Sequence, residues 1–106
     1  LEAQRLTAGA ELPEALLRLL DATGHAIRAV HDAGLEHVDL NARNLLIDES
    51  ERVYVIDLDR CQLHAEAPTD ARWRESNLSR LGRSLARFTP THHAACLARI
   101  RSAYQA

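Results

Sequence analysis

The chain has 106 residues, a formal net charge of −2 and 26% charged residues, which limits it to one domain with a core of modest size. This charge balance lacks the strong basic excess of a nucleic-acid-binding protein, so no nucleic-acid partner is expected. The two cysteines, and the lack of an apolar run long enough to span a bilayer, argue against a disulfide framework and a transmembrane helix. The cytoplasm is therefore the expected compartment.

The first predicted element is a long, mostly buried helix, preceded by a connecting segment over residues 1–12. Pro13 and Glu14 suit a helix N-terminus, because proline lacks the N–H left unbonded there and an acidic side chain complements the helix dipole. Apolar residues then recur at helical spacing, namely Leu16, Leu20, Ile27 and Val30, with Leu17 and Leu19 broadening the stripe. Gly34 is expected to cap the C-terminus. Gly24 costs about 1 kcal/mol relative to alanine inside a helix, which indicates close packing against a neighbour.

After this helix, the pattern changes to a loop and two short strands. The order is a loop over 37–44, an apolar strand over 45–48, a polar turn over 48–52 and a β-branched strand over 53–56. The two strands pair most simply as a hairpin. Such a hairpin would bring Asn44, just before the first strand, close to Asp57, just after the second.

The last third of the chain is predicted to be mostly helical, so the fold class is mainly α with one small β-hairpin. Residues 61–70 show no clear period and are interpreted as a loop. An amphipathic basic helix is expected over 72–88, and a last helix is expected around 93–104. The apolar residues of the first of these helices are Leu78, Leu81, Leu85 and Phe88, and its basic residues include Arg80, Arg83 and Arg87.

Three polar residues of the loop and hairpin are the types of residue that phosphoryl transfer requires. Asp39 and Asn44 lie five positions apart on the loop, and Asp57 follows the second strand. The reaction needs a carboxylate to orient the attacking hydroxyl and accept its proton, and hard oxygen ligands to hold Mg²⁺ against the phosphates. Asp39 suits the first role, whereas Asn44 and Asp57 suit the second. Each residue alone is more often a turn or cap residue, and only their joint spacing favours the catalytic interpretation.

Three blocks of the sequence carry a more specific signal. They are AGLEHVDLNARNLLID at 33–48, VYVIDLDR at 53–60 and WRESNLSRLGRSLAR at 73–87. In this order they resemble the lipopolysaccharide kinase family, and within it the bacterial 3-deoxy-D-manno-octulosonic acid (Kdo) kinases. The resemblance covers roughly residues 25–88, and three ordered blocks are far more specific than one motif.

The resemblance implies an ATP- and Mg²⁺-dependent kinase with a protein-kinase-like fold, active in the lipopolysaccharide biosynthesis of Gram-negative bacteria. Its acceptor would be a hydroxyl of the Kdo sugar attached to lipid A, reached by peripheral contact at the cytoplasmic face of the inner membrane. Asp39 would be the catalytic base, with His37 as a structural brace for its loop. Asn44 and Asp57 would be the Mg²⁺ ligands. Because the metal contacts ATP, both residues would also belong to the cofactor site.

Departures from the general protein-kinase pattern limit what this resemblance carries over. Val38 stands where an arginine usually precedes the base, so activation-loop phosphorylation is not expected. Asn41 replaces a phosphate-contacting lysine, while Leu58 and Asp59 replace the usual Phe-Gly pair. All 13 basic residues are arginine and no Gly-rich loop is present. The chain is therefore expected to be a C-terminal lobe without its N-terminal ATP lobe, and inactive on its own.

Alternatives remain open for the function and for the basic helix. The chain could instead be an inactive kinase-like fragment that acts as a binding piece, or part of a kinase for another small sugar or an aminoglycoside. The face formed by Arg80, Arg83 and Arg87 is either a solvated stripe or a contact for the carboxylate and phosphates of an acidic lipid-linked sugar. Other histidines and cysteines are expected to be structural: His25, His31, His92, His93, Cys61 and Cys96.

Overall fold

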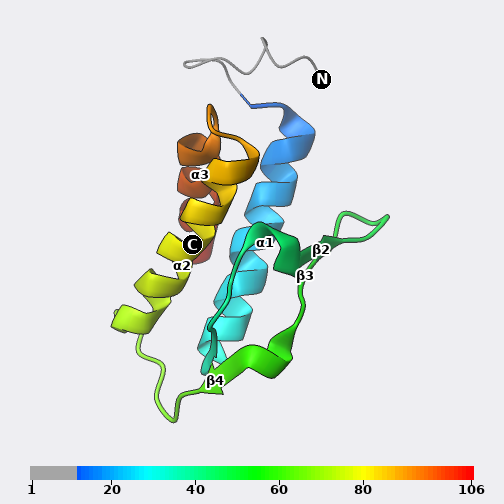
Figure 1. The fold of residues 1–106 in the computed structure, drawn as a ribbon. Coiled ribbons are helices and arrows are strands. Elements are labelled where there is room, and N and C mark those ends of the chain that lie inside the picture. Colours follow the sequence, from blue (N-terminus) through cyan, green and yellow to red (C-terminus); the bar gives the residue numbers. More distant parts are fainter. Residues whose placement is uncertain (1–11) are drawn as a thin grey trace.

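The computed structural model describes residues 12–106, which form three α-helices and two small antiparallel sheets (Figure 1). The elements are α1 (Glu14–Asp32), β1 (Leu35–His37), β2 (Leu45–Ile47), β3 (Val53–Val55), β4 (Cys61–Leu63), α2 (Arg72–Phe88) and α3 (His93–Gln105). Two single 3-10 turns, η2 (Ala42–Asn44) and η3 (Leu58–Arg60), lie in the connections. The mainly helical class is confirmed. Nearly all of the predicted connection over residues 1–12 lies outside the described residues.

Helix α1 has the predicted extent. It follows Pro13, whose carbonyl accepts a hydrogen bond from the Leu17 N–H, and Glu14 occupies its first turn. At the other end, Gly34 adopts a φ of 87° and donates its N–H to the His31 carbonyl. Only glycine adopts this left-handed conformation without steric cost, so Gly34 turns the chain from α1 into β1. None of the helices within residues 12–106 is long and apolar enough to cross a membrane.

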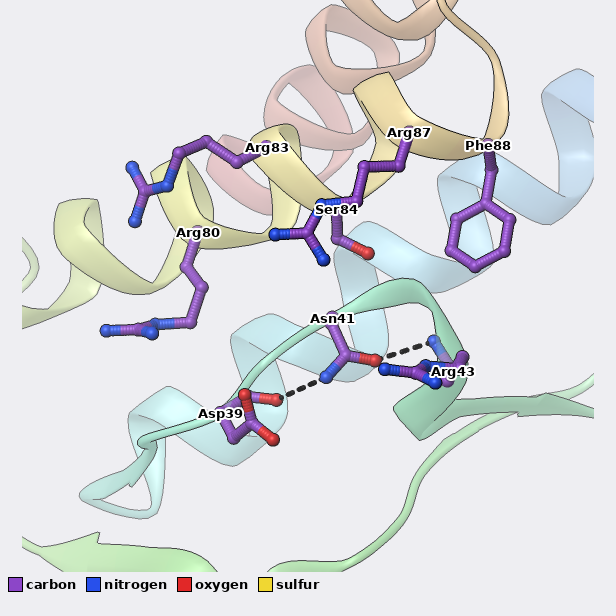
Figure 2. Close-up of a pocket in the computed structure, with 8 residues that line it drawn as sticks. All are labelled: Asp39, Asn41, Arg43, Arg80, Arg83, Ser84, Arg87 and Phe88. Carbon is purple, nitrogen blue, oxygen red and sulfur yellow. Dashed lines mark hydrogen bonds between the residues drawn. The ribbon is translucent and has the colours of Figure 1, made fainter.

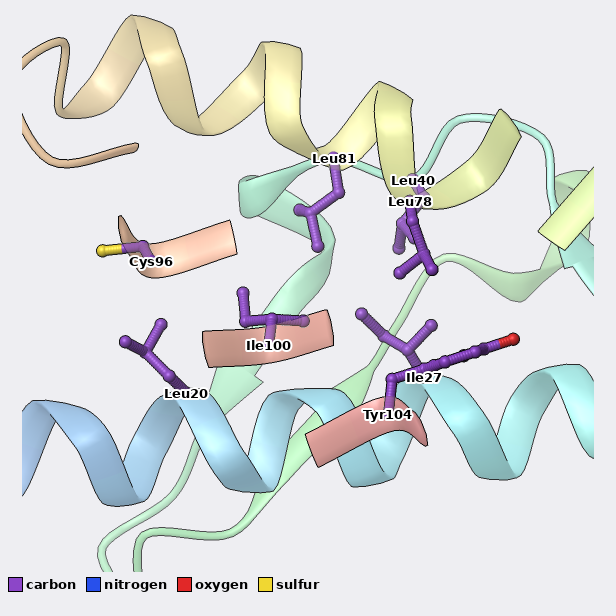
Figure 3. Packing of buried hydrophobic residues seen from close by; sticks show 8 residues of the cluster. All are labelled: Leu20, Ile27, Leu40, Leu78, Leu81, Cys96, Ile100 and Tyr104. Atoms are coloured by element: carbon purple, nitrogen blue, oxygen red, sulfur yellow. The ribbon is translucent and has the colours of Figure 1, made fainter. Parts of the chain in front are cut away.

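The hydrophobic core lies between the three helices and the loop that follows β1. Figure 3 shows the side chains that converge there, and they are Leu20, Ile27, Leu40, Leu78, Leu81, Cys96, Ile100 and Tyr104. Leu40 is the one member of this group that comes from the predicted catalytic loop, and only 1% of it is exposed. Burial of a leucine contributes roughly 1.5–3 kcal/mol. The core therefore anchors the loop itself and not only the helices around it.

The predicted hairpin is confirmed, but the predicted loop over residues 61–70 is partly wrong. Strands β2 and β3 pair antiparallel, with Leu45 opposite Val55. Cys61–Leu63 forms β4, which pairs antiparallel with β1, and the His64 N–H extends this pairing to the Gly34 carbonyl at 2.7 Å. A three-residue strand is too short to show a period of two, and its partner lies about 26 positions earlier, so the local sequence carries no signal for it. The pairing of β1 with β4 brings together the two ends of the segment that carries the loop and the hairpin.

Gly24 provides a test of the helix packing, because α1 approaches α3 closely at this residue, as expected from the sequence. A Cβ at this position would meet the Ile100 carbonyl oxygen and would lie 2.8 Å from the Ala103 Cβ on α3. We predict that Gly24→Ala lowers the free energy of unfolding by roughly 1–3 kcal/mol, since overpacking against a backbone atom forces the helices apart. Chemical denaturation measures this change.

Gly82→Ala is the matched control, because a Cβ at Gly82 on α2 would meet only the flexible end of Leu97. The gain in helix propensity of about 1 kcal/mol offsets that contact, so Gly82→Ala should be close to neutral. Equal destabilisation by the two variants would contradict the close packing of α1 on α3.

Candidate active site

The loop over residues 38–44 is organised around the backbone carbonyl of Asp39. This carbonyl accepts hydrogen bonds from two side-chain amides, Asn44 Nδ2 at 2.7 Å and Asn41 Nδ2 at 3.0 Å. The Asn41 Oδ1 in turn accepts from the Arg43 N–H at 2.8 Å and caps η2. Asparagine side chains readily form such local bonds to the backbone. The backbone of Asp39 is therefore fixed from the C-terminal side of the loop, while its carboxylate stays partly exposed.

His37 fixes the same loop from the N-terminal side. Its Nδ1 accepts a hydrogen bond from the Asp39 N–H at 3.3 Å, and its Nε2 lies 2.8 Å from the Ile56 carbonyl oxygen. These two contacts require the tautomer with the proton on Nε2, because a carbonyl can only accept. The ring is buried. His37 thus makes the contacts of a brace, joining the Asp39 loop to the segment that precedes Asp57.

A backbone hydrogen bond brings Asn44 close to Ile56, the residue that precedes Asp57. The Ile56 N–H donates to the Asn44 carbonyl at 2.8 Å, so the residue next to Asp57 is bonded to Asn44. Asp57 itself has a left-handed backbone with φ of 66° and ψ of 48° and an exposed side chain. A non-glycine residue in this conformation is uncommon, and such strain is often found at functional sites.

The chemistry of this donor set fits Mg²⁺. Asn44 uses its Nδ2 for the Asp39 carbonyl, which leaves Oδ1 as the atom able to face a cation, and Asp57 contributes carboxylate oxygens. Mg²⁺ is typically bound by one or two such protein oxygens together with phosphate oxygens and water. When bound, the ion would neutralise charge on the phosphates of a nucleotide. Asn44 and Asp57 are the residues that would hold it.

A buried asparagine on α2, Asn77, is hydrogen-bonded to the backbone at the start of the loop. The Asn77 Oδ1 accepts from the His37 N–H at 3.0 Å, and its Nδ2 donates to the His37 carbonyl at 2.7 Å. The same Oδ1 lies 3.0 Å from His31 Nε2 on α1. Sequence reasoning missed Asn77 as a site residue. The available signal is its position four residues before Leu81, on the buried face of a helix, where an asparagine needs a specific partner.

The network continues from His31 to the C-terminal helix. His31 Nδ1 lies 2.6 Å from the Tyr104 hydroxyl, which accepts a hydrogen bond from Arg74 Nη1 at 3.1 Å. Because Arg74 can only donate and His31 Nε2 donates to Asn77, the Tyr104 O–H must donate to His31 Nδ1. Burial lowers the pKa of His31, and the positive charge of Arg74 lowers it further, although the hydrogen bond to Asn77 opposes this shift. His31 is therefore neutral in the folded protein at neutral pH.

The carboxylate of Asp39 borders a pocket of about 380 Å³ between the loop and α2 (Figure 2). Its lining is Asp39, Asn41, Arg43, Arg80, Arg83, Ser84, Arg87 and Phe88, and we call it the arginine pocket. The Ser84 hydroxyl accepts the Ala42 N–H at 2.8 Å, which ties α2 to the loop. The structure thus brings Asp39 together with Arg80, Arg83 and Arg87. Asn44 and Asp57 do not belong to the lining of this pocket.

His31 and the two cysteines lie wholly or partly inside the fold, whereas His25 is exposed. His31 and Cys96 are buried, Cys61 is half-buried, and both thiols are free. Burial raises the pKa of Cys61, and the charges of Asp59 and Asp57 raise it further, which disfavours a reactive thiolate. Between residues 12 and 106 no three histidine, cysteine or acidic side chains are grouped to hold a metal ion.

Comparison with known proteins identifies the family of the chain. The model of the lipopolysaccharide kinase (Kdo/WaaP) family matches residues 3–104. Because this match covers nearly the whole chain, the chain belongs to this family. The mainly helical fold with small antiparallel sheets is consistent with that assignment.

Two relatives illustrate the similarity. The 3-deoxy-D-manno-octulosonic acid kinase of Xanthomonas euvesicatoria pv. vesicatoria is 51% identical over 65 residues, which cover 61% of this chain and 25% of that protein. The kinase of the same name from Vibrio cholerae is 44% identical over 61 residues, covering 58% of this chain and 24% of that protein. The matched segments thus span about a quarter of the curated relatives. No solved structure matches the chain.

The buried network predicts a pH dependence of stability. Because His31 stays neutral in the fold, the unfolded chain binds the extra proton first as the pH falls below about 6.5. The free energy of unfolding should therefore decrease between pH 7 and pH 5, by at most about 1.4 kcal/mol per pH unit from this group. Urea denaturation at several pH values measures the slope.

Two variants on α1 test whether His31 causes the pH dependence of the free energy of unfolding. His31→Gln should reduce this dependence, whereas His25→Gln, at an exposed position of the same helix, should leave it unchanged. If the slope is the same in His31→Gln as in the parent protein, the neutral buried role of His31 is wrong.

Proposed function

We propose that this chain is the C-terminal, catalytic lobe of a protein-kinase-like enzyme that transfers the γ-phosphoryl group of ATP to a hydroxyl of lipid A-linked Kdo. One observation carries the proposal. The backbone of Asp39 is held from both sides by His37, Asn41 and Asn44, while its carboxylate borders a pocket large enough for a sugar. A catalytic base needs this combination of fixed position and access to the substrate.

The proposed role of Asp39 is to orient the acceptor hydroxyl and to accept its proton. As the hydroxyl oxygen bonds to the γ-phosphorus, the bond to the oxygen that bridges the β- and γ-phosphates breaks, and ADP leaves. The proton of the hydroxyl passes to the Asp39 carboxylate. Asn44 and Asp57 would hold the Mg²⁺ that neutralises the phosphates.

The nucleotide requires groups that these residues do not supply. The sequence contains no lysine, so the lysine that pairs with the phosphates in kinases would belong to an N-terminal lobe elsewhere in the complete protein. The acceptor assignment is supported by the names of the relatives, which are Kdo kinases. A lipid-linked acceptor places the reaction at a membrane surface, which we propose to be the cytoplasmic face of the inner membrane.

Replacement of the proposed base tests the mechanism. In the complete protein, Asp39→Asn should lower kcat by at least about 100-fold, because the amide cannot accept the proton. The KM for ATP should change little, since Asp39 has no assigned role in nucleotide binding. Transfer of labelled γ-phosphate to Kdo-lipid A measures both constants.

Asp70→Asn is the matched control, because Asp70 lies in the exposed connection before α2. It should retain the parental kcat. A kcat for Asp39→Asn within a few-fold of this control would exclude Asp39 as the base.

The metal assignment has a separate test. Asp57→Asn removes a charged oxygen ligand, so the Mg²⁺ concentration that gives half-maximal activity should rise about tenfold or more. A titration of activity with Mg²⁺ at saturating ATP measures this. An unchanged Mg²⁺ requirement would remove Asp57 from the metal site.

A further inference from the structure

We infer that the arginine pocket binds an oxyanion of the acceptor, either a carboxylate or a phosphate, beside Asp39. For the identity of the acceptor this inference rests on the proposed function. It adds a binding site on α2 and explains how an acidic substrate would be held while its hydroxyl reaches the base.

The charges of the pocket are the first argument. Arg43, Arg80, Arg83 and Arg87 line it together with a single carboxylate, that of Asp39. Elsewhere in the described part of the chain, most arginines form ion pairs with carboxylates, as Arg18, Arg28, Arg74, Arg99 and Arg101 do, whereas Arg52 and Arg72 do not.

Among residues 12–106 no ion pair involves any of the four pocket arginines, so four unpaired guanidinium groups gather around one carboxylate. Like charges one turn apart on a helix destabilise it, and an anion in the pocket would reverse that effect. The pocket therefore has a charge pattern that a bound anion completes.

The positions of the side chains are the second argument. Figure 2 shows Arg80 and Arg87 extending from α2 on the side of the loop that carries Asp39 and Asn41, whereas Arg83 extends away from that loop. The guanidinium group presents paired N–H donors that match the two oxygens of a carboxylate or phosphate. Arg80 and Arg87 are therefore the principal anion contacts, and Arg83 lies at the outer edge.

The anchoring of α2 is the third argument. Ser84 lies between Arg80 and Arg87 on the same helix, and its hydroxyl accepts the Ala42 N–H at 2.8 Å. Asn77, one turn before Arg80, holds the backbone of His37. The arginines thus project from a helix bonded directly to the catalytic loop. These bonds would hold an anion on α2 at a fixed distance from the Asp39 carboxylate. A stripe of arginines that only contacts solvent would require no such bonds.

Equilibrium binding without ATP tests the inference independently of turnover. Kdo-lipid A in detergent micelles is titrated against the complete protein and its variants. Arg80→Gln and Arg87→Gln should each weaken binding about tenfold or more, as expected for the loss of a charge-assisted contact. Arg83→Gln should have a smaller effect.

Arg72→Gln is the matched control, because Arg72 is exposed on the same helix and lies outside the pocket lining. Binding by Arg80→Gln and Arg87→Gln equal to that of this control would overturn the inference. All four positions are exposed, so the variants should unfold at the parental temperature, and this is checked by thermal denaturation.

A second titration, with lipid A that lacks Kdo, distinguishes the two sources of the oxyanion, which are the sugar carboxylate and a lipid phosphate. If the arginines hold the sugar carboxylate, Arg87→Gln weakens binding of Kdo-lipid A only. If they hold a lipid phosphate, the variant weakens binding of both. The transfer assay tests the function separately, because arginine-dependent binding without transfer would refute the kinase activity and leave the anion site in place.

Discussion

The clamp of Asn77 on the backbone of His37 is the interaction on which the rest of the site depends. One carboxamide bonds both the N–H and the carbonyl of the residue at which the loop begins, and its oxygen also meets His31. Only 1% of Asn77 is exposed, so no solvent replaces these bonds. Each buried polar group left unsatisfied costs about 1–3 kcal/mol, and loss of this amide would leave several. The clamp therefore couples the stability of the helices to the position of Asp39.

Helix α2 serves two purposes because its opposite faces have different neighbours. The inner face carries Asn77, Leu78 and Leu81 into the core, where they meet α1, α3 and the loop residue Leu40. The outer face carries the arginines that line the pocket next to Asp39. A single helix thus bonds to the loop on one face and lines the arginine pocket on the other. If the proposed roles hold, this arrangement would keep the anion contacts and the base at a fixed spacing, and such positioning is a main protein contribution to phosphoryl transfer.

The helices and the hairpin could be predicted because their signals are local. Apolar residues at a period of 3.6 mark α1 and α2, β-branched residues mark β3, and Gly34 marks the end of α1. The close approach at Gly24 could also be predicted, since a glycine inside a helix requires a packing reason. Strand β4 could not, because three residues show no period and their partner strand is distant in the sequence.

The candidate site was predictable only in part. The residue types and the spacing of Asp39, Asn44 and Asp57 predict a phosphoryl-transfer role, and that role stays a prediction. The network from Asn77 through His31 to Tyr104 joins residues 46 and 73 positions apart, and no local pattern records such bonds. The proximity of Asp39 to the arginines of α2 likewise depends on how α2 packs against the loop. Tertiary contacts determine both features.

The most direct test of the central claim is phosphate transfer by the complete protein that contains these residues. ATP labelled at the γ-phosphate is incubated with Kdo-lipid A and Mg²⁺, and the lipid product is separated and analysed for its site of phosphorylation. If this chain is the catalytic lobe of a Kdo kinase, one labelled phosphate ester should form on a Kdo hydroxyl. If Kdo-lipid A remains unlabelled while ATP and Mg²⁺ are bound, the assignment of this chain as the catalytic lobe of a Kdo kinase is contradicted.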